Sequence, residues 1–220
     1  MIPLWDASRR PVHFPVMTAF IIVANVVGFM LELSGGDDFV LRWSVVPADI
    51  VAGHHWETLL TSMFLHGSWA HIIGNMVFLW AFGPEIEDVM NPLRYLAFYL
   101  LGGVLAMSVQ VAANPTLTIP CLGASGAIAA VMGAFLVLYP RDRIRTLLFF
   151  GFFVTMAYVP AVLLIGFWFV IQLLGAGIGA VAQVNTGGIA YLAHVSGAVF
   201  GAIAVGWFRD RARVAAGAAD

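Results

Sequence analysis

The chain of 220 residues is poor in charge. Asp, Glu, Lys and Arg together make up only 10% of it, whereas a soluble domain has about 25%. It contains no lysine, and no run of basic residues points to a nucleic-acid partner. Its single cysteine, Cys121, excludes an internal disulfide and any cysteine-based zinc site. What remains is a chain dominated by apolar side chains.

The apolar content is correspondingly high, with 61% hydrophobic residues and a mean hydropathy of +0.94. One core of ordinary shape cannot hide this much apolar surface from water, so we expect a multi-pass membrane protein with a single domain. A cleavable signal peptide is not expected, because the first apolar run starts after Pro15 and is too long for one. The first span should therefore act as its own signal.

We expect an all-α protein with six membrane-spanning helices, separated by polar and helix-breaking residues. The expected spans are residues 15–33, 69–82, 93–112, 122–139, 160–180 and 189–208. Together they form a six-helix membrane domain over residues 15–208. A short cytoplasmic segment, residues 1–14, should precede it, and a cytoplasmic tail, residues 209–220, should follow it.

The connections between the spans carry expectations of their own. Residues 34–38 should end the first helix, and residues 56–65 are expected to form a short helix in the membrane interface. The apolar part of the second helix should end at Gly83-Pro84, so the acidic residues after it are expected in water: Glu85, Glu87 and Asp88. One span over residues 146–181 would be about twice as long as a bilayer needs, so we expect residues 147–158 to lie on the membrane surface or to tilt.

The distribution of arginine predicts the orientation. With six spans, both termini lie on the same side of the membrane. Only Arg42 then falls on the opposite side. The other arginines share the side of the termini: Arg9, Arg10, Arg94, Arg141, Arg143, Arg145, Arg209, Arg211 and Arg213. Because basic residues stay on the cytoplasmic side, both termini are predicted to be cytoplasmic.

This topology brings five polar residues to one depth near the outer side. Ser125 lies at the start of the fourth span, and His194 lies about one turn into the sixth. His71 and Asn75 lie in the first two turns of the second span, and His66 lies just before it. Each residue alone has a simpler explanation, such as bonding between helices. Their common depth favours a functional site, because polar groups in membrane helices are costly.

Helix packing predicts that Ser125 and His194 can meet. His194, Gly197 and Gly201 share one face of their helix, and Gly126 keeps the facing helix small. A serine becomes a strong nucleophile when a neutral histidine takes its proton. Between Asp142 and Asp210 the sequence has no acidic residue, so we expect a serine-histidine dyad without a carboxylate.

Acyl transfer also requires donors for the oxyanion. Asn75 and His71 are four residues apart and therefore share a helix face. Their side-chain N–H groups, together with the backbone N–H of Ser125, would form a suitable oxyanion hole.

These residues resemble the rhomboid family of intramembrane serine proteases. The resemblance rests on three motifs in the right order: His66 with His71 and Asn75, then Gly123-Ala-Ser-Gly126, then Ala193-His-Val-Ser-Gly-Ala-Val-Phe-Gly201. It covers nearly the whole chain from Trp56 to Gly201. It implies hydrolysis of peptide bonds in transmembrane substrates without a metal or cofactor. It also implies that the partners are transmembrane proteins and the lipid bilayer, and it leaves the oligomeric state open.

The resemblance also assigns roles by position. Ser125 matches the nucleophile, His194 the general base, and His71, Asn75 and the Ser125 N–H the oxyanion hole. Gly123 matches the position before the serine where the backbone comes close, and His66 a histidine of the water-retaining cavity.

Two positions depart from the family pattern. Many members have a Trp-Arg pair in the first loop, where this chain has Trp56-Glu57. Some members have a tyrosine four residues after the serine that stacks on the histidine, where this chain has Ala129. Packing must then orient the histidine.

Other functions remain to be separated from proteolysis. A rhomboid-like protein that binds client helices without cutting them would lack the serine or the histidine, and this chain has both. A metal or ion carrier would use the histidines His54, His55, His66, His71 and His194, but no His-Glu-x-x-His pattern supports it.

The expected location is the plasma membrane, with the site toward the outside. The substrate should enter between the second span, near Phe78, and the fifth, near Phe167 and Trp168. The loop at residues 184–188 should then lie above the site.

Overall fold

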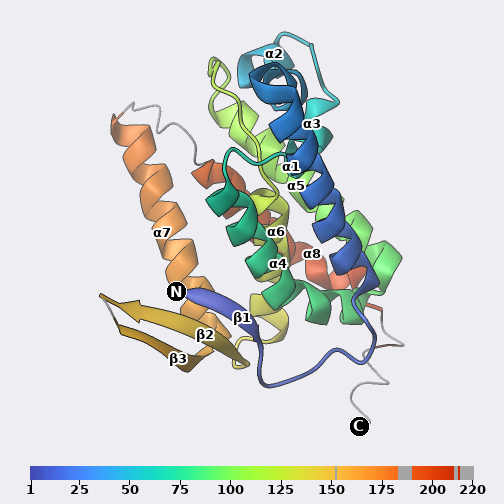
Figure 1. The fold of residues 1–220 in the computed structure, drawn as a ribbon, viewed down its shortest axis with the longest axis vertical. Coiled ribbons are helices and arrows are strands. Elements are labelled where there is room, and N and C mark those ends of the chain that lie inside the picture. The colour runs from blue at the N-terminus through green and yellow to red at the C-terminus, as the bar shows by residue number, and fades with distance from the viewer. Residues whose placement is uncertain (152, 183–189, 211–212, 214–220) are drawn as a thin grey trace.

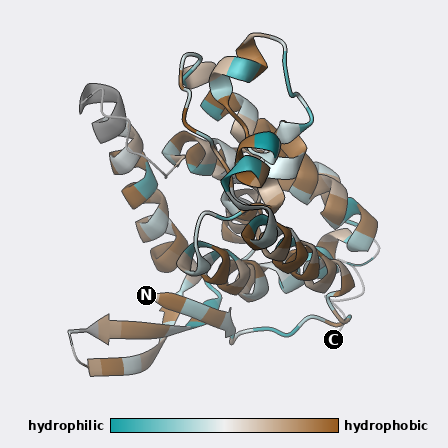
Figure 2. Cartoon of the chain, turned by 45° about the horizontal axis from the view of Figure 1, so that its top comes forward, coloured by the Kyte–Doolittle hydropathy of each residue, from teal (hydrophilic) through white to brown (hydrophobic). Residues whose placement is uncertain are grey.

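The computed structural model describes residues 1–151, 153–182, 190–210 and 213. Most of these residues form helices that run along one axis of the molecule (Figure 1). The long helices are α1 (Val16–Trp43), α4 (Trp69–Met90), α5 (Pro92–Ala113), α6 (Ser125–Leu138), α7 (Ala161–Ala182) and α8 (Tyr191–Phe208). Over the described residues, α1, α5 and α8 are long and apolar enough to cross a membrane. Figure 2 shows apolar residues along much of their length.

The central helix is α6, which packs against α4, α5 and α8. Its residues from Gly126 to Phe135 are all buried, and many are Ala or Gly. Small side chains allow neighbouring backbones to approach closely, which is how helices associate in lipid. A Cβ atom on Gly197 or Gly201 of α8 would overlap the backbone carbonyl oxygens of Gly126 and Ala130 on α6. The α6–α8 contact is therefore made by backbones with almost nothing between them.

A three-stranded antiparallel sheet corrects the all-α expectation. It has the order β1 (Ile2–Asp6), β2 (Arg143–Phe150) and β3 (Phe153–Pro160). Residues 147–158, expected as a surface or tilted segment, form most of this β2–β3 hairpin. Their aromatic and β-branched residues are typical of strands, and the tight turn contains Gly151 at φ +60°. The first strand comes from the N-terminal segment, for which no regular structure was expected.

The apolar part of the second helix was expected to end at Gly83-Pro84 with its acidic residues in water, but α4 continues through Pro84 to Met90. Glu85 and Glu87 are buried, not in water. The Glu87 carboxylate accepts hydrogen bonds from the backbone N–H groups of Met17 (2.8 Å) and Thr18 (2.7 Å) at the start of α1. The first N–H groups of a helix lack partners inside it and carry a partial positive charge, so they stabilise this buried anion.

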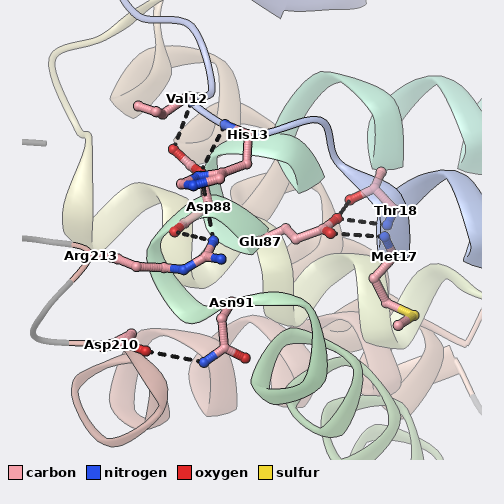
Figure 3. A network of polar contacts seen from close by, with 9 residues as sticks. All are labelled: Val12, His13, Met17, Thr18, Glu87, Asp88, Asn91, Asp210 and Arg213. Atoms are coloured by element: carbon pink, nitrogen blue, oxygen red, sulfur yellow. Dashed lines mark hydrogen bonds and ion pairs between the residues drawn. The ribbon is translucent and has the colours of Figure 1, made fainter. Parts of the chain in front are cut away.

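The same end of the molecule holds further polar contacts between segments that are far apart in sequence (Figure 3). Asp88 accepts a hydrogen bond from the backbone N–H of Val12 (2.9 Å) and lies within 3.9 Å of the guanidinium of Arg213. Asn91 donates a hydrogen bond to Asp210 after α8 (3.2 Å). The N-terminal segment, the end of α4 and the end of α8 therefore lie together at the end opposite α2 (Pro47–Val51) in Figure 1.

Two smaller differences lie near the other end of the bundle. The first helix does not end at residues 34–38, because α1 resumes after a kink at Gly36 (φ +65°) and reaches Trp43. In place of one interfacial helix, residues 56–65 contain two short ones, α3 (Thr58–Thr61) and the 3-10 helix η1 (Ser62–Phe64). Residues 184–188, expected as a loop above the site, lie outside the described residues.

Candidate active site

Ser125 is the first residue of α6, and the backbone before it has an unusual shape. Gly123 adopts φ +124°, a conformation that side chains rarely tolerate, and its N–H donates to the Ser62 carbonyl (2.9 Å). A Cβ atom at Gly123 would lie 2.9 Å from the His71 ring and 3.7 Å from Ser125 Oγ. Glycine therefore leaves a small space that is bordered by both side chains.

His194 lies one turn into α8 and reaches Ser125 across the close α6–α8 contact. Its Nε2 atom is 2.7 Å from Ser125 Oγ. The facing glycines, Gly126 and Gly197, let the two backbones approach, since a Cβ on Gly197 would overlap the Gly126 carbonyl oxygen. Two residues that are 69 positions apart thus form a short hydrogen bond. This is the geometry in which an imidazole can take a hydroxyl proton.

Helix α7 contacts the imidazole on the side away from Ser125. His194 Nδ1 is 2.8 Å from Oε1 of Gln172, and the Gln172 Nε2 donates to the Trp168 carbonyl (3.2 Å). The Trp168 ring lies against the His194 ring, with centroids 5.7 Å apart and planes tilted by 37°. Because Ala129 stands where some relatives have a tyrosine, packing alone was expected to orient His194. The hydrogen bond with Gln172 shows that its orientation depends on more than packing.

The histidines of the second motif lie on the remaining side. The His66 and His71 rings meet edge to face, with centroids 5.1 Å apart. The backbone N–H of His66 donates to Glu32 of α1 (2.8 Å), which ties the loop before α4 to the first helix. Burial lowers the pKa of the His66 imidazole to about 3, so this ring is neutral at physiological pH.

Asn75 lies one turn below His71 on α4 and is buried. Within the described part of the chain its Nδ2 has no hydrogen-bond partner. A buried donor without a partner costs free energy, so such a group in a site is available for a ligand. The structure brings His71 beside Gly123 and Ser125, whereas the Nδ2 of Asn75 makes no hydrogen bond to the serine.

Two residues of this region were missed by sequence reasoning. Glu32 and Gln172 fall within the expected first and fifth spans, and no role was expected for either. A signal for Gln172 was available, because it follows Trp168 by four residues and is the only Gln, Asn or charged residue in 161–182. Among the described residues, no three His, Cys, Asp or Glu side chains lie together in a way that could hold a metal.

Comparison with known proteins shows which family this chain resembles. A family model described as the rhomboid domain matches residues 53–211. The RHOMBOID-like protein 12, mitochondrial, of Arabidopsis thaliana is 31% identical over 208 residues, which are 87% of this chain and 57% of that protein. The rhomboid protease GluP of Bacillus subtilis is 30% identical over 127 residues, or 56% of this chain and 24% of GluP.

A further relative is the Rhomboid protein 1, mitochondrial, of Saccharomyces cerevisiae. It is 26% identical over 178 residues, which are 79% of this chain and 47% of the yeast protein. The chain thus spans between about a quarter and somewhat over half the length of these three curated relatives.

Proposed function

The chain belongs to the rhomboid family, and from that premise we propose that it is an intramembrane serine endopeptidase. It would hydrolyse peptide bonds in or near the transmembrane segments of other membrane proteins, without a cofactor. The observation that carries this proposal is the 2.7 Å contact between Ser125 Oγ and His194 Nε2. It agrees with the name of GluP, which calls that relative a protease.

In the proposed reaction, the Ser125 hydroxyl gives its proton to His194 Nε2 while Oγ attacks the scissile carbonyl carbon. The imidazolium then protonates the leaving amine, and an acyl-enzyme remains on Ser125. A water molecule gives a proton to the same imidazole and attacks the ester. Collapse of this second intermediate releases the carboxylate product and returns the proton to Oγ.

The negative oxygen of each intermediate needs donors. The backbone N–H of Ser125 is one candidate, because the first N–H groups of a helix have no partner inside it. The His71 ring borders the same space as Ser125 Oγ, and Asn75 has an unused Nδ2 one turn away. Gly123 would leave room for the substrate backbone there, and the buried His66 would support His71 from behind.

The same proposal includes six membrane spans with cytoplasmic termini. The support is that α1, α4, α5, α6, α7 and α8 alternate in direction (Figure 1). Arginines gather at the end that holds the sheet, whereas Ser125 lies toward the other end. A cysteine introduced at Asp49 of α2 should react with an impermeant reagent from outside, and one at Arg143 should not. The reverse result would exclude this topology.

The compartment is a separate question. Relatives named as mitochondrial stand beside a bacterial one. The comparisons therefore give no support to the expected plasma membrane in particular. We propose only that the chain is an integral membrane protein. Its site would face the side of the membrane opposite the cytoplasm or, in an organelle, the side that corresponds to it.

Cleavage of a model transmembrane substrate by purified protein in liposomes tests the activity. Ser125→Ala and His194→Ala should each abolish cleavage while leaving the thermal unfolding temperature in detergent unchanged. Ser196→Ala is the matched control, because Ser196 lies on α8 and its hydroxyl donates to the Leu192 and Ala193 carbonyls of its own helix. Substrate that stays bound but uncut by the wild-type protein would favour a non-proteolytic client-binding role instead.

A further inference from the structure

The geometry around His194 points to a third member of the site. We propose that Gln172 is the positioning residue that holds His194 in its reactive tautomer, and that it does so from α7. The inference rests on the proposed serine-histidine activity and extends it. The site then contains a chain of hydrogen bonds from Ser125 through His194 to Gln172, and the histidine of the dyad is oriented by more than packing.

The hydrogen-bond pattern determines which way the Gln172 amide faces. Its NH₂ group donates to the Trp168 carbonyl at 3.2 Å, since a carbonyl can only accept. The other amide atom, Oε1, is then the one that faces His194 Nδ1 at 2.8 Å. If the amide were reversed, two oxygen acceptors would face each other at Trp168. The backbone of α7 therefore selects an acceptor for the imidazole.

An acceptor at Nδ1 decides where the imidazole carries its proton. Neutral histidine has one N–H and one lone pair, and Gln172 Oε1 can only be satisfied by an N–H at Nδ1. The lone pair then lies on Nε2, which is 2.7 Å from Ser125 Oγ. This is the tautomer that can receive the serine proton. The opposite tautomer would direct an N–H at the hydroxyl and could not act as a base.

A neutral amide suits the position. Gln172 is 6% exposed, within a helix of otherwise apolar residues. A carboxylate in the same place would be a buried charge with no cation beside it, which is costly inside a membrane. The amide oxygen provides the orienting function and part of the electrostatic stabilisation of the imidazolium, without that cost.

The placement on α7 makes the site sensitive to that helix. Gln172 and Trp168 hold the imidazole by an edge and a face, and both belong to α7. This helix lies at one side of the bundle (Figure 1), where its neighbours are α6, α8 and β3. An outward movement of α7 would remove the acceptor and the stacked ring together. His194 is then expected to be a competent base only while α7 is seated against α8.

The test compares two variants, one without and one with an acceptor for Nδ1. Gln172→Met keeps a long unbranched side chain but has no acceptor. Gln172→Glu keeps an acceptor oxygen at the same distance along the chain, and because burial favours the protonated acid, its O–H can still donate to the Trp168 carbonyl. Two rates are measured for each folded protein. One is modification of Ser125 by a small fluorophosphonate, which needs no helix to enter the site. The other is cleavage of a transmembrane substrate, resolved into kcat and KM.

Gln172→Met should slow both the modification and kcat by about tenfold, the typical value of one net hydrogen bond, with KM unchanged. Gln172→Glu should restore both rates to within about threefold of wild type. Leu163→Ala is the control, because this exposed α7 side chain lies nine residues away, or about 14 Å along the helix. It should leave both rates unchanged.

Other outcomes overturn the inference. Wild-type fluorophosphonate reactivity in Gln172→Met, with slower cleavage or a raised KM, would assign Gln172 to substrate contact. Equal losses in the Met and Glu variants would assign it to packing. If Gln172→Met lowers the thermal unfolding temperature, Gln172→Leu takes its place. It is then compared with Gln172→Glu at a temperature where these two variants are folded, and the same criteria apply. Failure of the proposed function looks different, because the wild-type protein itself would then neither react nor cleave.

Discussion

Gly123 shows how one residue shapes the site at the scale of single side chains. Its positive φ turns the chain into α6 so that Ser125 starts the helix, and its missing Cβ leaves the space between His71 and the serine hydroxyl open. An alanine there would be strained by its backbone and would meet the His71 ring at 2.9 Å. The position therefore links backbone geometry to access of a substrate carbonyl.

Asn75 carries the prediction that belongs to this scale. If its Nδ2 stabilises the oxyanion, Asn75→Ala should lower kcat by about 10²-fold or more and change KM little. Asn25→Ala is the matched control, since Asn25 is also a buried amide but bonds to the Ile21 carbonyl of its own helix. A loss confined to KM, or an equal loss in the control, would give Asn75 a structural role.

Some residues of the candidate site could be predicted from the sequence, and others could not. Ser125, His194 and Gly123 belong to short motifs whose members lie next to one another in sequence, so the structure was needed only to measure how they meet. Gln172 and Glu32 each stand between apolar neighbours in their helices. Their partners, His194 and the His66 backbone, come from other helices, and only a three-dimensional arrangement identifies them.

At the scale of elements, the α6–α8 contact sets the distance between serine and histidine. Gly197→Ala should push the helices apart, because its Cβ would overlap the Gly126 carbonyl oxygen. We expect a loss of about 1–3 kcal/mol of stability, as for other overpacked cores, together with lower activity. Gly206→Ala provides the control on the same helix, since no atom lies within 4 Å of its added Cβ.

The measurement is thermal unfolding in detergent, followed by cleavage at a temperature where both glycine variants are folded. Equal stability and activity of Gly197→Ala and wild type would contradict the close contact. Reduced activity in Gly206→Ala would mean that helix propensity or lipid contact, and not the α6–α8 separation, controls the site.

The sheet carries a prediction about pH. Burial raises the pKa of Asp6 in β1 to about 6; the Ser8 N–H bonded to it opposes the rise, and the nearby Asp142 adds to it. The folded protein therefore holds this proton at pH values where the unfolded chain, with an ordinary aspartate pKa, has lost it. The associated stability is fully present below about pH 4 and is lost as the pH rises through about 6.

Asp6→Asn should remove this loss, because an amide stays neutral and can still accept from Ser8. The variant is expected to be about 1–3 kcal/mol more stable than wild type at pH 7.5 and no more stable at pH 4. Thermal unfolding of both proteins between pH 4 and 8 measures the difference. Asp38→Asn, which changes an exposed carboxylate on α1, should show no such trend. A constant difference across the range would contradict the assignment.

Elements also show where local patterns stop being informative. The structure has α5 at Pro92–Ala113 and α8 at Tyr191–Phe208, within two residues of the expected ends, because each is an apolar run between helix-breaking or polar residues. The prediction that Glu87 lies in water was wrong, because its carboxylate is stabilised by the start of α1, some 70 residues away in sequence. The hairpin was missed because its apolar residues suit a membrane helix as well as a strand.

At the scale of the whole molecule, the two ends of the bundle have different tasks. At one end the N-terminal strand pairs with the β2–β3 hairpin. At the same end the segment after that strand, the end of α4 and the end of α8 meet through charged and polar contacts (Figure 3). The other end holds the serine, the histidines and the short helices of the first loop. A polar end opposite the proposed active site agrees with the proposal of an enzyme that acts near one surface of the membrane.

In the proposed reaction Ser125 is the nucleophile and His194 makes it reactive. The most direct test is to treat the purified protein with a fluorophosphonate, digest it and analyse the peptides by mass spectrometry. We expect a single modified peptide carrying the probe on Ser125, no modification in Ser125→Ala, and a loss of at least about 10³-fold in rate in His194→Ala. Modification at another serine, or equal rates in wild type and His194→Ala, would contradict the proposed reaction.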